Sequence, residues 1–492
     1  MSQAIETVDV IIVGAGLSGI GAGVHLQDKC PDRSFLILEG RETLGGTWDL
    51  FRYPGVRSDS DMHTLGYSFK PWTGTKAITD GHTILAYIEE TAADYGIDRK
   101  IRFQHQVIEA SWSSEEARWM VTAITKDTGS RVTFACNFLL VCSGYYNYKA
   151  GHTPDFSGRE AFKGDIVHPQ HWPRDLNYEG KNVVVIGSGA TAVTLVPAMA
   201  ETAAHVTMLQ RSPSYVVAMP DRDRVADGLR KFLPAKMAYG LTRWKNIKIG
   251  AYFYGRTRKQ PEKVRKWIID KVKKKLGPEI DVDKHFNPAY NPWDQRLCLI
   301  PNGDLFRSLK LGKASVVTES IETFTKNGIE LVSGEHLDAD IIVTATGLRV
   351  LALGDIDIDV DGEKIDFSKV WSYKGVAYSD LPNLVSTFGY INASWTLRAD
   401  LIAAYVCRLL NHMRATGTQR CIPRLRPSDQ GMQKRPLIEN FSSGYIQRAL
   451  PGLPSQGDCD PWTNPQSYAL DKKALSQCPI DDGVMTFSRA GS

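Results

Sequence analysis

Short apolar runs bounded by glycine-rich turns mark the first 40 residues of the chain. Val8–Val13 and Ser34–Leu38 predict two buried strands. The residues that follow the first turn, up to about Lys29, favour a helix. A strand, a turn, a helix and a second strand in this order predict a βαβ unit, in which two parallel strands share one sheet.

The same alternation returns in the middle of the chain. Asn182–Ile186 and His205–Leu209 predict the strands of a second βαβ unit, and Asp340–Val343 predicts a further strand. A polar, β-rich stretch spans roughly Val107–Phe134, and Asn137–Val141 predicts another buried strand after it. We therefore predict an α/β fold with two Rossmann-like dinucleotide-binding domains.

The first turn reads Gly14-Ala15-Gly16-Leu17-Ser18-Gly19, with the GxGxxG spacing in its required place between strand and helix. Gly14 permits the tight turn, Gly16 lets the backbone approach a pyrophosphate, and Gly19 lets the helix pack on the strand. Glu39 follows the second strand and is placed to accept hydrogen bonds from a ribose, which favours FAD or NAD.

The second turn reads Gly187-Ser188-Gly189-Ala190-Thr191-Ala192, where alanine replaces the third glycine, as the fingerprint allows. The strand after it ends in Gln210-Arg211 and has no acid at that point. An arginine there suits a 2′-phosphate, so the second nucleotide is expected to be NADPH. Two turns with opposite strand-end chemistry are far more specific than one glycine motif alone.

The stretch from about Asp221 to Asn291 has helical spacing and interrupts the second unit. From Arg222 to Lys275 it holds 18 Lys and Arg against 4 Asp and Glu, although the whole chain has a net charge of only +4. Two interpretations stay open: a solvated helical face, or a surface for peripheral membrane contact or for the phosphates of an incoming cofactor. No nucleic-acid-binding motif accompanies the charge, so we expect no nucleic-acid partner.

Composition narrows the class of protein further. A chain of 492 residues with 42% hydrophobic and 23% charged residues fits a soluble protein of two or three domains. The eight cysteines form no CxxC pair and no zinc-ligand spacing, which indicates a reducing compartment and no metal site. The apolar stretch Val10–Val24 lacks a basic leader, and no run of about 18 apolar residues exists, so we expect a cytoplasmic protein.

Two longer motifs connect these features. Phe162–Pro173 reads FxGxxxHxxxWP just before the second glycine turn, and Gly45–Asp59 contains Gly-Gly-x-Trp followed by Tyr-Pro-Gly-x-x-x-Asp. With both motifs and both turns, the chain resembles the class B flavoprotein monooxygenases. The ending Trp172-Pro173 is typical of their Baeyer–Villiger type, and several shorter segments resemble the bacterial ethionamide-activating subgroup.

The resemblance implies two cofactors, FAD and NADPH, held by discontinuous domains. FAD is expected in residues 1–147 and 348–492, NADPH in residues 148–220 and 292–347, and a basic helical insertion at 221–291. The implied FAD contacts are Gly14, Gly16, Ser18, Gly19, Glu39, Thr47, Trp48, Asp59 and Val107. The implied NADPH contacts are Gly187, Ser188, Gly189, Ala190, Thr191, Ala192, Val193, Gln210 and Arg211, with Arg57, Ser58 and Asp59 reaching the nicotinamide side.

The resemblance also implies the reaction, which inserts one atom of O₂ beside a ketone carbonyl to give an ester or lactone. Sulfides and thioamides are further implied substrates. Arg296 matches the catalytic arginine of the family, and Asp59 is expected to hold it near the flavin. A permanently charged guanidinium suits the stabilisation of developing negative charge. Gln295 stands where many relatives carry a lysine for the 2′-phosphate, so the NADPH preference rests mainly on Arg211.

Several alternatives stay open at this point. A heteroatom monooxygenase would make sulfoxides or N-oxides and need Arg296 less, and a NADP(H)-sensing binding protein would carry both turns without turnover. Asp59 could cap the helix that it precedes. His168 titrates near neutral pH, as a catalytic group does, but its place in a linker favours a structural hinge.

Overall fold

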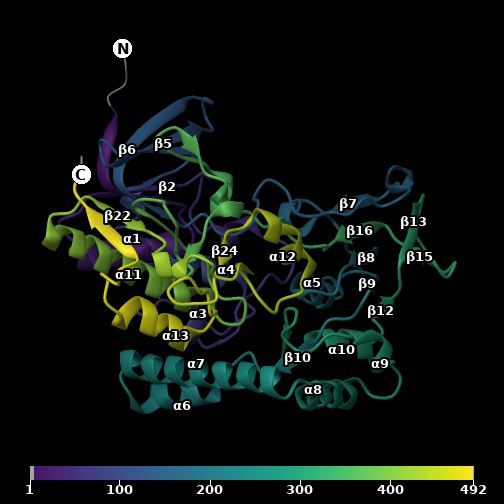
Figure 1. The fold of residues 1–492 in the computed structure, drawn as a ribbon. Helices are drawn as coiled ribbons and strands as arrows, with labels where there is room; N and C mark the ends of the chain where they lie inside the picture. The colour runs from purple at the N-terminus through teal and green to yellow at the C-terminus, as the bar shows by residue number, and fades with distance from the viewer. Residues whose placement is uncertain (1–4, 491–492) are drawn as a thin grey trace.

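Two units built on parallel strands lie side by side, with a band of helices along their lower edge in Figure 1. The computed structural model describes residues 5–490. The first unit contains a 9-stranded sheet in the order β18-β17-β4-β5-β6-β1-β2-β3, and β21 also pairs with β6. Its strands are β1 (Glu6–Val13), β2 (Phe35–Leu38), β3 (Ile101–Arg102), β4 (His105–Ser113), β5 (Arg118–Thr125), β6 (Arg131–Val141), β17 (Asp357–Val360), β18 (Glu363–Lys364) and β21 (Leu384–Ser386).

One strand prediction is wrong. Asn137–Val141 is not a separate strand but the end of β6, which begins at Arg131 and pairs antiparallel with β5. Asn137 is exposed, while the residues on either side of it in the strand are buried. A single polar residue therefore points outward without ending the strand.

Helices from both ends of the chain cover the first sheet. Helix α1 (Leu17–Lys29) packs against α11 (Trp395–Thr416), and both share one apolar core with α4 (Gly81–Asp94). Residues after 383 thus return to the unit in which the chain began. Shorter helices of this unit are α2 (Thr47–Leu50), α3 (Met62–Leu65), α12 (Gly444–Ala449) and α13 (Tyr468–Lys472).

The second unit contains a 5-stranded parallel sheet in the order β12-β9-β8-β16-β7. Helix α5 (Ala190–Met199) follows β8 directly, as the second βαβ prediction requires. The strands are β7 (Asp165–Val167), β8 (Asn182–Ile186), β9 (His205–Gln210), β12 (Ala314–Thr318) and β16 (Ile341–Thr344). Around them lie β10 (Val216–Met219), β11 (Cys298–Pro301), α10 (Asp304–Lys310), and a small antiparallel sheet of β13 (Ile321–Thr325), β14 (Gly328–Leu331) and β15 (His336–Asp338).

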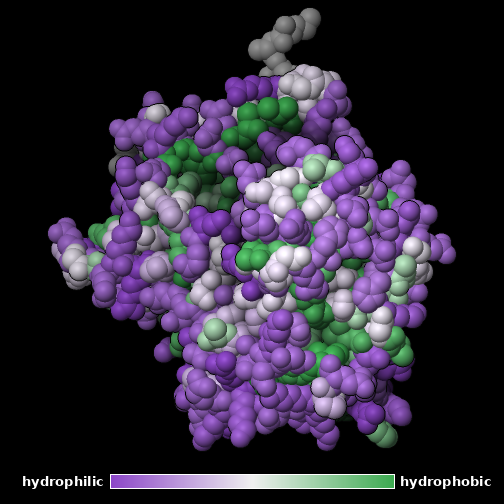
Figure 2. Space-filling view, turned by 90° about the vertical axis from the view of Figure 1, so that its right-hand side faces the viewer, coloured by the Kyte–Doolittle hydropathy of each residue, from purple (hydrophilic) through white to green (hydrophobic). Residues whose placement is uncertain are grey.

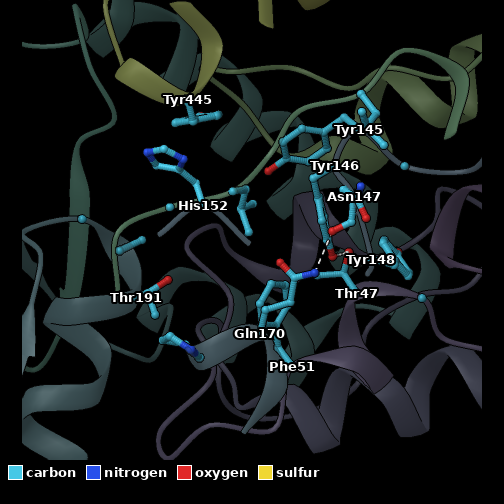
Figure 3. Close-up of a pocket in the computed structure, with 18 of the residues that line it drawn as sticks. Thr47, Phe51, Tyr145, Tyr146, Asn147, Tyr148, His152, Gln170, Thr191 and Tyr445 are labelled. Atoms are coloured by element: carbon cyan, nitrogen blue, oxygen red, sulfur yellow. Dashed lines mark hydrogen bonds between the residues drawn. The ribbon is translucent and has the colours of Figure 1, made fainter. Parts of the chain in front are cut away.

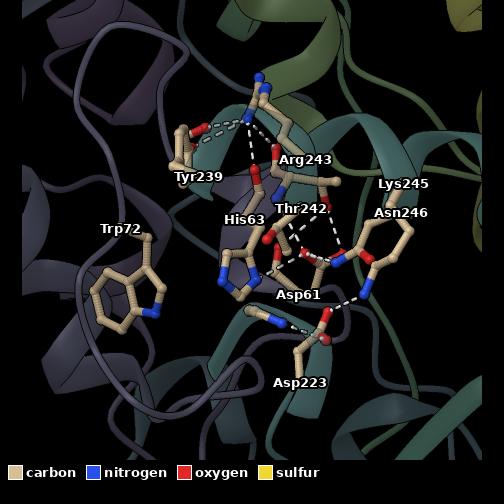
Figure 4. Close-up of polar contacts among 12 residues, drawn as sticks. Asp61, His63, Trp72, Asp223, Tyr239, Thr242, Arg243, Lys245 and Asn246 are labelled. Atoms are coloured by element: carbon tan, nitrogen blue, oxygen red, sulfur yellow. Dashed lines mark hydrogen bonds and ion pairs between the residues drawn. The ribbon is translucent and has the colours of Figure 1, made fainter. Parts of the chain in front are cut away.

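The basic stretch is helical, as its spacing predicts. It folds into α6 (Arg224–Phe232), α7 (Ala235–Lys259), α8 (Pro261–Leu276) and α9 (Val282–His285). Helix α8 buries Ile268 and Val272 in the core of the second unit. Helix α7 instead joins the first unit, where Arg243 Nη1 donates to the carbonyls of His63 and Gly66 at 2.9 and 2.7 Å (Figure 4). The two long helices therefore attach to different units.

Outside the helical insertion the chain crosses between the units twice, and these two crossings pair with each other. Asn147 N donates to the carbonyl of Arg349 at 2.7 Å, and His152 N donates to that of Gly347 at 3.0 Å. Gln170 of the FxGxxxHxxxWP motif donates from Nε2 to the carbonyl of Asn147 at 2.7 Å. The ring of His168 packs on Gly151, where an added Cβ would lie 2.0 Å from His168 Cε1. The motif thus contacts the first crossing at both Asn147 and Gly151, which supports a hinge role for His168.

Candidate active site

A cavity of about 1330 Å³ lies between the two units. This exceeds the volume of roughly 300–1,000 Å³ that one small ligand usually occupies. Both glycine turns line it, together with the two crossings and a segment of the C-terminal region around α12. Figure 3 shows Thr191 of the second turn, Asn147 and His152 of the first crossing and Tyr445 of α12 around the cavity. Within residues 5–490, no group of three His, Cys, Asp or Glu side chains is arranged to hold a metal ion.

The glycines of the first turn occupy positions that other residues do not fit. Gly14 has φ +101°, and an added Cβ would lie 2.7 Å from the carbonyl oxygen of Cys142. A Cβ at Gly19 would lie 1.9 Å from the carbonyl oxygen of Gly14, so Gly19 serves helix packing and does not line the cavity. Gly16 and Ser18 do line it. This division matches the structural roles expected of the three glycines in the fingerprint, but the predicted contact of Gly19 with FAD is wrong, because Gly19 packs against the backbone of Gly14.

The strand beside the first turn ends in a buried acid. Glu39 is 6% exposed, and its two carboxylate oxygens accept hydrogen bonds from Ala15 N at 2.7 Å and Arg41 N at 2.8 Å. Burial raises the pKa of Glu39, and the two backbone amides oppose that shift. The carboxylate also borders the cavity, as a ribose ligand requires.

The second glycine turn has more empty space around its backbone than the first turn has. Gly187 has φ +144° and packs against the carbonyl of Ala345, but a Cβ at Gly189 would meet nothing within 4 Å. Ser188, Gly189, Ala190 and Thr191 line the cavity. Open backbone at the start of a helix suits a phosphate group, because free amides and the helix dipole both favour an anion.

Three predicted NADPH contacts do not reach the cavity. Ala192 and Val193 are buried in the core of the second unit, because the first turns of α5 direct them toward the sheet. Gln210 is 2% exposed and turns away, donating from Nε2 to the carbonyl of His285 at 2.8 Å and to Thr318 Oγ1 at 2.9 Å. Arg211 does line the cavity, and its guanidinium makes no hydrogen bond or ion pair with any residue that the structure describes.

The two predicted catalytic residues meet in the cavity. Arg296 Nη2 donates to Asp59 Oδ2, and about a third of each side chain is exposed, 33% and 35% respectively. The charge of Asp59 raises the pKa of Arg296, which keeps the guanidinium protonated. Asp59 does not cap the following helix, because Asp61 does so by accepting from Thr64 N. The alternative role considered for Asp59 is therefore wrong.

Arg57, Ser58 and Gln295 also lie near the Arg296–Asp59 pair, and they differ in their contacts. Arg57 forms an ion pair with Asp304 at the start of α10, which ties the first unit to the second. Ser58 is 2% exposed, and both Arg57 and Ser58 still border the cavity. Gln295 borders the cavity beside Arg296. The Arg57–Asp304 pair has no signal in the sequence, since 247 residues separate its partners.

Aromatic side chains form much of the cavity wall. Thr47 Oγ1 and the hydroxyl of Tyr146 are 2.7 Å apart, and Tyr146 stacks on Tyr148 (Figure 3). Tyr145 stacks on Trp395, whose Nε1 donates to Ser18 Oγ at 2.8 Å. Trp48 and Val107 also line the cavity.

The C-terminal region supplies wall residues that sequence reasoning missed. Tyr445 and Arg448 of α12 both line the cavity, and Tyr445 lies close enough to Arg296 to contribute to the raised pKa of that guanidinium. Burial raises the pKa of Tyr445. Motif spacing gives no signal for these two residues, because they lie in a segment of short helices and turns far from either glycine motif.

The cavity suits two large polar cofactors. Gly16 and Gly189 leave space that a side chain would fill, and Ser143 Oγ and Gln170 Oε1 are buried there with no hydrogen-bond partner among residues 5–490. Buried polar atoms normally have a partner, so these two atoms point to a polar ligand. Two dinucleotide turns that face one cavity define an oxidoreductase in which two redox cofactors meet.

Comparisons with known proteins identify the family. A model described as flavin-binding monooxygenase-like matches residues 76–393, and an NAD(P)-binding Rossmann-like domain matches residues 12–73. The FAD-containing monooxygenase EthA of Mycobacterium tuberculosis is 53% identical over 485 residues, 98% of each chain. The probable FAD-binding monooxygenase AlmA of Acinetobacter baylyi is 48% identical over 483 residues, 98% of this chain and 96% of that protein.

Solved structures agree on the fold. An oxidized steroid monooxygenase bound to NADP superposes with a TM-score of 0.80 at 22% identity, covering 98% of this chain and 100% of that one. Cyclohexanone monooxygenase from Rhodococcus sp. Phi1 gives 0.70 at 22% identity, covering 86% and 87%. The chain belongs to the flavin-binding monooxygenase family, and it is an FAD-dependent monooxygenase. The predicted α/β class and the resemblance to class B flavoprotein monooxygenases are confirmed, which speaks against a binding protein without turnover.

Proposed function

We propose that the protein is a Baeyer–Villiger monooxygenase that uses NADPH and O₂ to convert ketones to esters or lactones. The observation that carries the proposal is the Arg296–Asp59 pair inside the cavity that both glycine turns share. Reduced FAD, when bound, supplies the activated oxygen atom. The fit rests on Gly16, Gly189 and the two unpartnered buried oxygens of Ser143 and Gln170.

The residues of the chain then have distinct tasks. Arg296 stays protonated and stabilises the negative charge that develops on the substrate oxygen. Asp59 fixes the direction of the guanidinium through a charge-assisted hydrogen bond. The aromatic wall of Tyr145, Phe388 and Trp395 excludes water from the reacting carbonyl and accepts the apolar part of a ketone.

The cofactor arrangement follows the two turns. The first unit (residues 1–147 and 348–492) holds FAD, and the second (148–220 and 292–347) holds NADPH, with 221–291 as a helical insertion. The unpaired Arg211 supports NADPH over NADH, because a free guanidinium can donate hydrogen bonds to the oxygens of a 2′-phosphate. The steroid and cyclohexanone monooxygenases of the same fold were both solved with NADP.

The protein acts on its small-molecule substrate in the cytoplasm. Its eight cysteines are free thiols, of which six are buried, as expected in a reducing compartment. Among residues 5–490, no helix combines the length and apolar character that crossing a bilayer requires.

Replacing Arg296 tests the proposal. In Arg296→Ala, ester formation from a ketone panel, measured by mass spectrometry, falls by roughly 100- to 1,000-fold, the usual effect of losing one stabilising donor. Anaerobic reduction of the flavin by NADPH stays within a few-fold of wild type. Arg296→Lys retains part of the activity because it keeps the charge but loses the planar fork. Unchanged ester formation in Arg296→Ala would overturn the proposal.

Oxidation of sulfides or thioamides is a second activity of the same cavity, because its aromatic wall accepts any apolar substrate of suitable size. The same variant separates the two chemistries. If Arg296→Ala keeps sulfoxidation at the wild-type rate, and this activity exceeds ester formation in the wild type, the protein is a heteroatom monooxygenase instead.

A further inference from the structure

Exposed apolar side chains are concentrated on the basic helices. Of the 13 large hydrophobic residues that are exposed in the described chain, eight lie on α6, α7 and α8. Isolated exposed apolar residues are normal on protein surfaces, but a contiguous set marks a surface that meets a partner or a membrane. These helices therefore differ from a solvated helical face, which presents charged residues.

The exposed residues of α7 share one side of the helix. Met237, Leu241, Trp244, Lys248 and Tyr252 follow spacings of four, three, four and four, which place them on one face at 3.6 residues per turn. The four apolar members are 56%, 47%, 62% and 66% exposed. Phe232, at the end of α6 just before α7, is 86% exposed. We call these six residues the aromatic–basic face.

The opposite side of α7 is fastened to the first unit. Tyr239 donates from its hydroxyl to the carbonyl of Tyr67 at 2.9 Å, and Asn246 Nδ2 donates to Asp61 Oδ1 at 2.8 Å (Figure 4). Arg243 lies between them, buried and bound to backbone carbonyls. Because this side is held rigidly inward, the aromatic–basic face points away from the body of the molecule.

Positive charge surrounds the face. Lys248 lies within it, Lys259 continues the same side of α7, and Arg256 stacks over Tyr252 at 5.9 Å. None of these three forms an ion pair with a residue in the range 5–490, so their charges are available to a partner. Along α8, Lys271 lies 5.9 Å from the ring of the half-exposed Trp267. The lower part of the surface in Figure 2, where α8 lies, is mostly hydrophilic.

We propose that the aromatic–basic face docks the protein on an anionic membrane surface. Aromatic rings with an apolar body and a polar edge settle at the headgroup level, and lysines beside them pair with lipid phosphates. Each Lys or Arg near such a surface contributes about 1 kcal/mol of attraction. A second copy of the chain is a poorer occupant, because two faces of the same positive charge repel each other. The inference does not depend on which substrate the enzyme oxidises.

Vesicle sedimentation with the FAD-loaded protein tests the proposal. Wild type sediments with vesicles of equal parts phosphatidylcholine and phosphatidylglycerol at low salt. It stays in solution with pure phosphatidylcholine and at about 1 M salt, where screening shortens the range of charge attraction to about 3 Å.

Two variant pairs separate the apolar and the charged contributions. Trp244→Ser with Tyr252→Ser lowers the membrane-bound to free ratio at least ~10-fold, since both rings leave the interface. Lys248→Glu with Lys259→Glu has an effect of similar size that disappears at high salt. The matched controls are Val332→Ser and Lys326→Glu, which change exposed residues in the turns of the small antiparallel sheet in the second unit and leave binding unchanged. NADPH oxidation in solution stays at the wild-type level in all variants.

Three results would overturn the proposal. One is a wild type that fails to sediment with anionic vesicles at low salt. Another is sedimentation that the two face variants do not reduce more than the controls do. The third is a concentration-dependent dimer, detected by light scattering, that Trp244→Ser with Tyr252→Ser abolishes, because the face would then be an interface between copies of the chain.

Discussion

The two glycine turns share one backbone plan but differ in what surrounds them. Gly14 and Gly187 both have positive φ, and an added Cβ would lie 2.7 Å from the carbonyl oxygen of Cys142 and 2.4 Å from that of Ala345, respectively. In each unit, the turn therefore packs against the strand end where the chain leaves for the other unit. The shared plan explains why both motifs were visible in the sequence.

The strand ends beside the turns are opposites. Glu39 is buried and accepts hydrogen bonds from two backbone amides. Arg211, in contrast, is exposed to the cavity and unpaired within residues 5–490. A buried, pre-ordered acid fits a dinucleotide that stays bound, because little reorganisation accompanies binding. A free cation at an open turn fits a dinucleotide that arrives and leaves, with charge guiding the encounter. We infer that the first turn is built for retention and the second for exchange.

The largest effect is expected at the first turn. Gly14→Ala forces an alanine into a positive-φ conformation, which costs about 1–3 kcal/mol, and the contact with Cys142 adds a further ~1–3 kcal/mol. The purified variant is expected to lose most of its FAD absorbance and to melt roughly 5 °C or more below wild type.

Gly96→Ala is the matched control. Gly96 has φ +65° but no neighbour within 4 Å of an added Cβ, so it reports backbone strain without the steric contact. The control is expected to keep its FAD and to lose less stability than Gly14→Ala. Equal losses in both variants would mean that close packing at the first turn is not what retains the flavin.

A smaller effect, confined to the second cofactor, is expected for Arg211→Ala. Loss of a hydrogen bond to a charged group costs about 1.5–3 kcal/mol, so KM for NADPH rises roughly 10- to 100-fold. KM for NADH and the FAD content stay the same. The control is Gln210→Ala, which removes a residue that points away from the cavity and therefore leaves the ratio of the two KM values unchanged. A rise in both KM values for Arg211→Ala would contradict recognition of the 2′-phosphate.

The glycine turns can be predicted from the local strand–turn–helix pattern. The Arg296–Asp59 pair can be predicted from the resemblance of longer motifs to the family. Gly14 and Gly19 follow from the geometry of a strand, a turn and a helix, which a short segment encodes. Gln210, by contrast, stands at the sequence position expected for an NADPH contact, but its side chain points away from the cavity. Its side chain pairs with His285, 75 residues away, and no local pattern contains that contact.

The C-terminal wall of the cavity and helix α7 show the other limit of the sequence. Tyr445 reaches the cavity only because the segment after α11 folds back toward the boundary between the units, and that path depends on tertiary packing. The charge of α7 was visible in the composition. Which of its sides faces outward depends on Arg243 and Asn246, whose partners His63 and Asp61 lie far back in the chain.

The smallest predicted effect concerns the pH dependence of stability at Glu39. Burial raises the folded-state pKa of this carboxyl above its unfolded value of about 4.3, so the folded protein holds the proton to higher pH than the unfolded chain does. The contribution of Glu39 to stability is therefore fully present below pH ~4.3 and declines as pH rises through the folded-state pKa. Thermal unfolding of the flavin-free protein across this range is expected to show that decline, and Glu39→Gln is expected to remove it.

The slope with pH is the deciding observable, because Glu39→Gln also replaces one acceptor oxygen with a donor that faces a backbone amide and so lowers stability at every pH. Glu42→Gln, an exposed change three residues away, keeps the wild-type slope. If stability instead rises with pH in the wild type but not in Glu39→Gln, the amides of Ala15 and Arg41 outweigh burial, and the carboxylate is fully ionised before any ribose arrives. The charged Glu39 carboxylate would then be what retains the dinucleotide at the first turn. Both turns would in that case rely on a charge that is present before the ligand binds, as proposed above for Arg211 at the second turn.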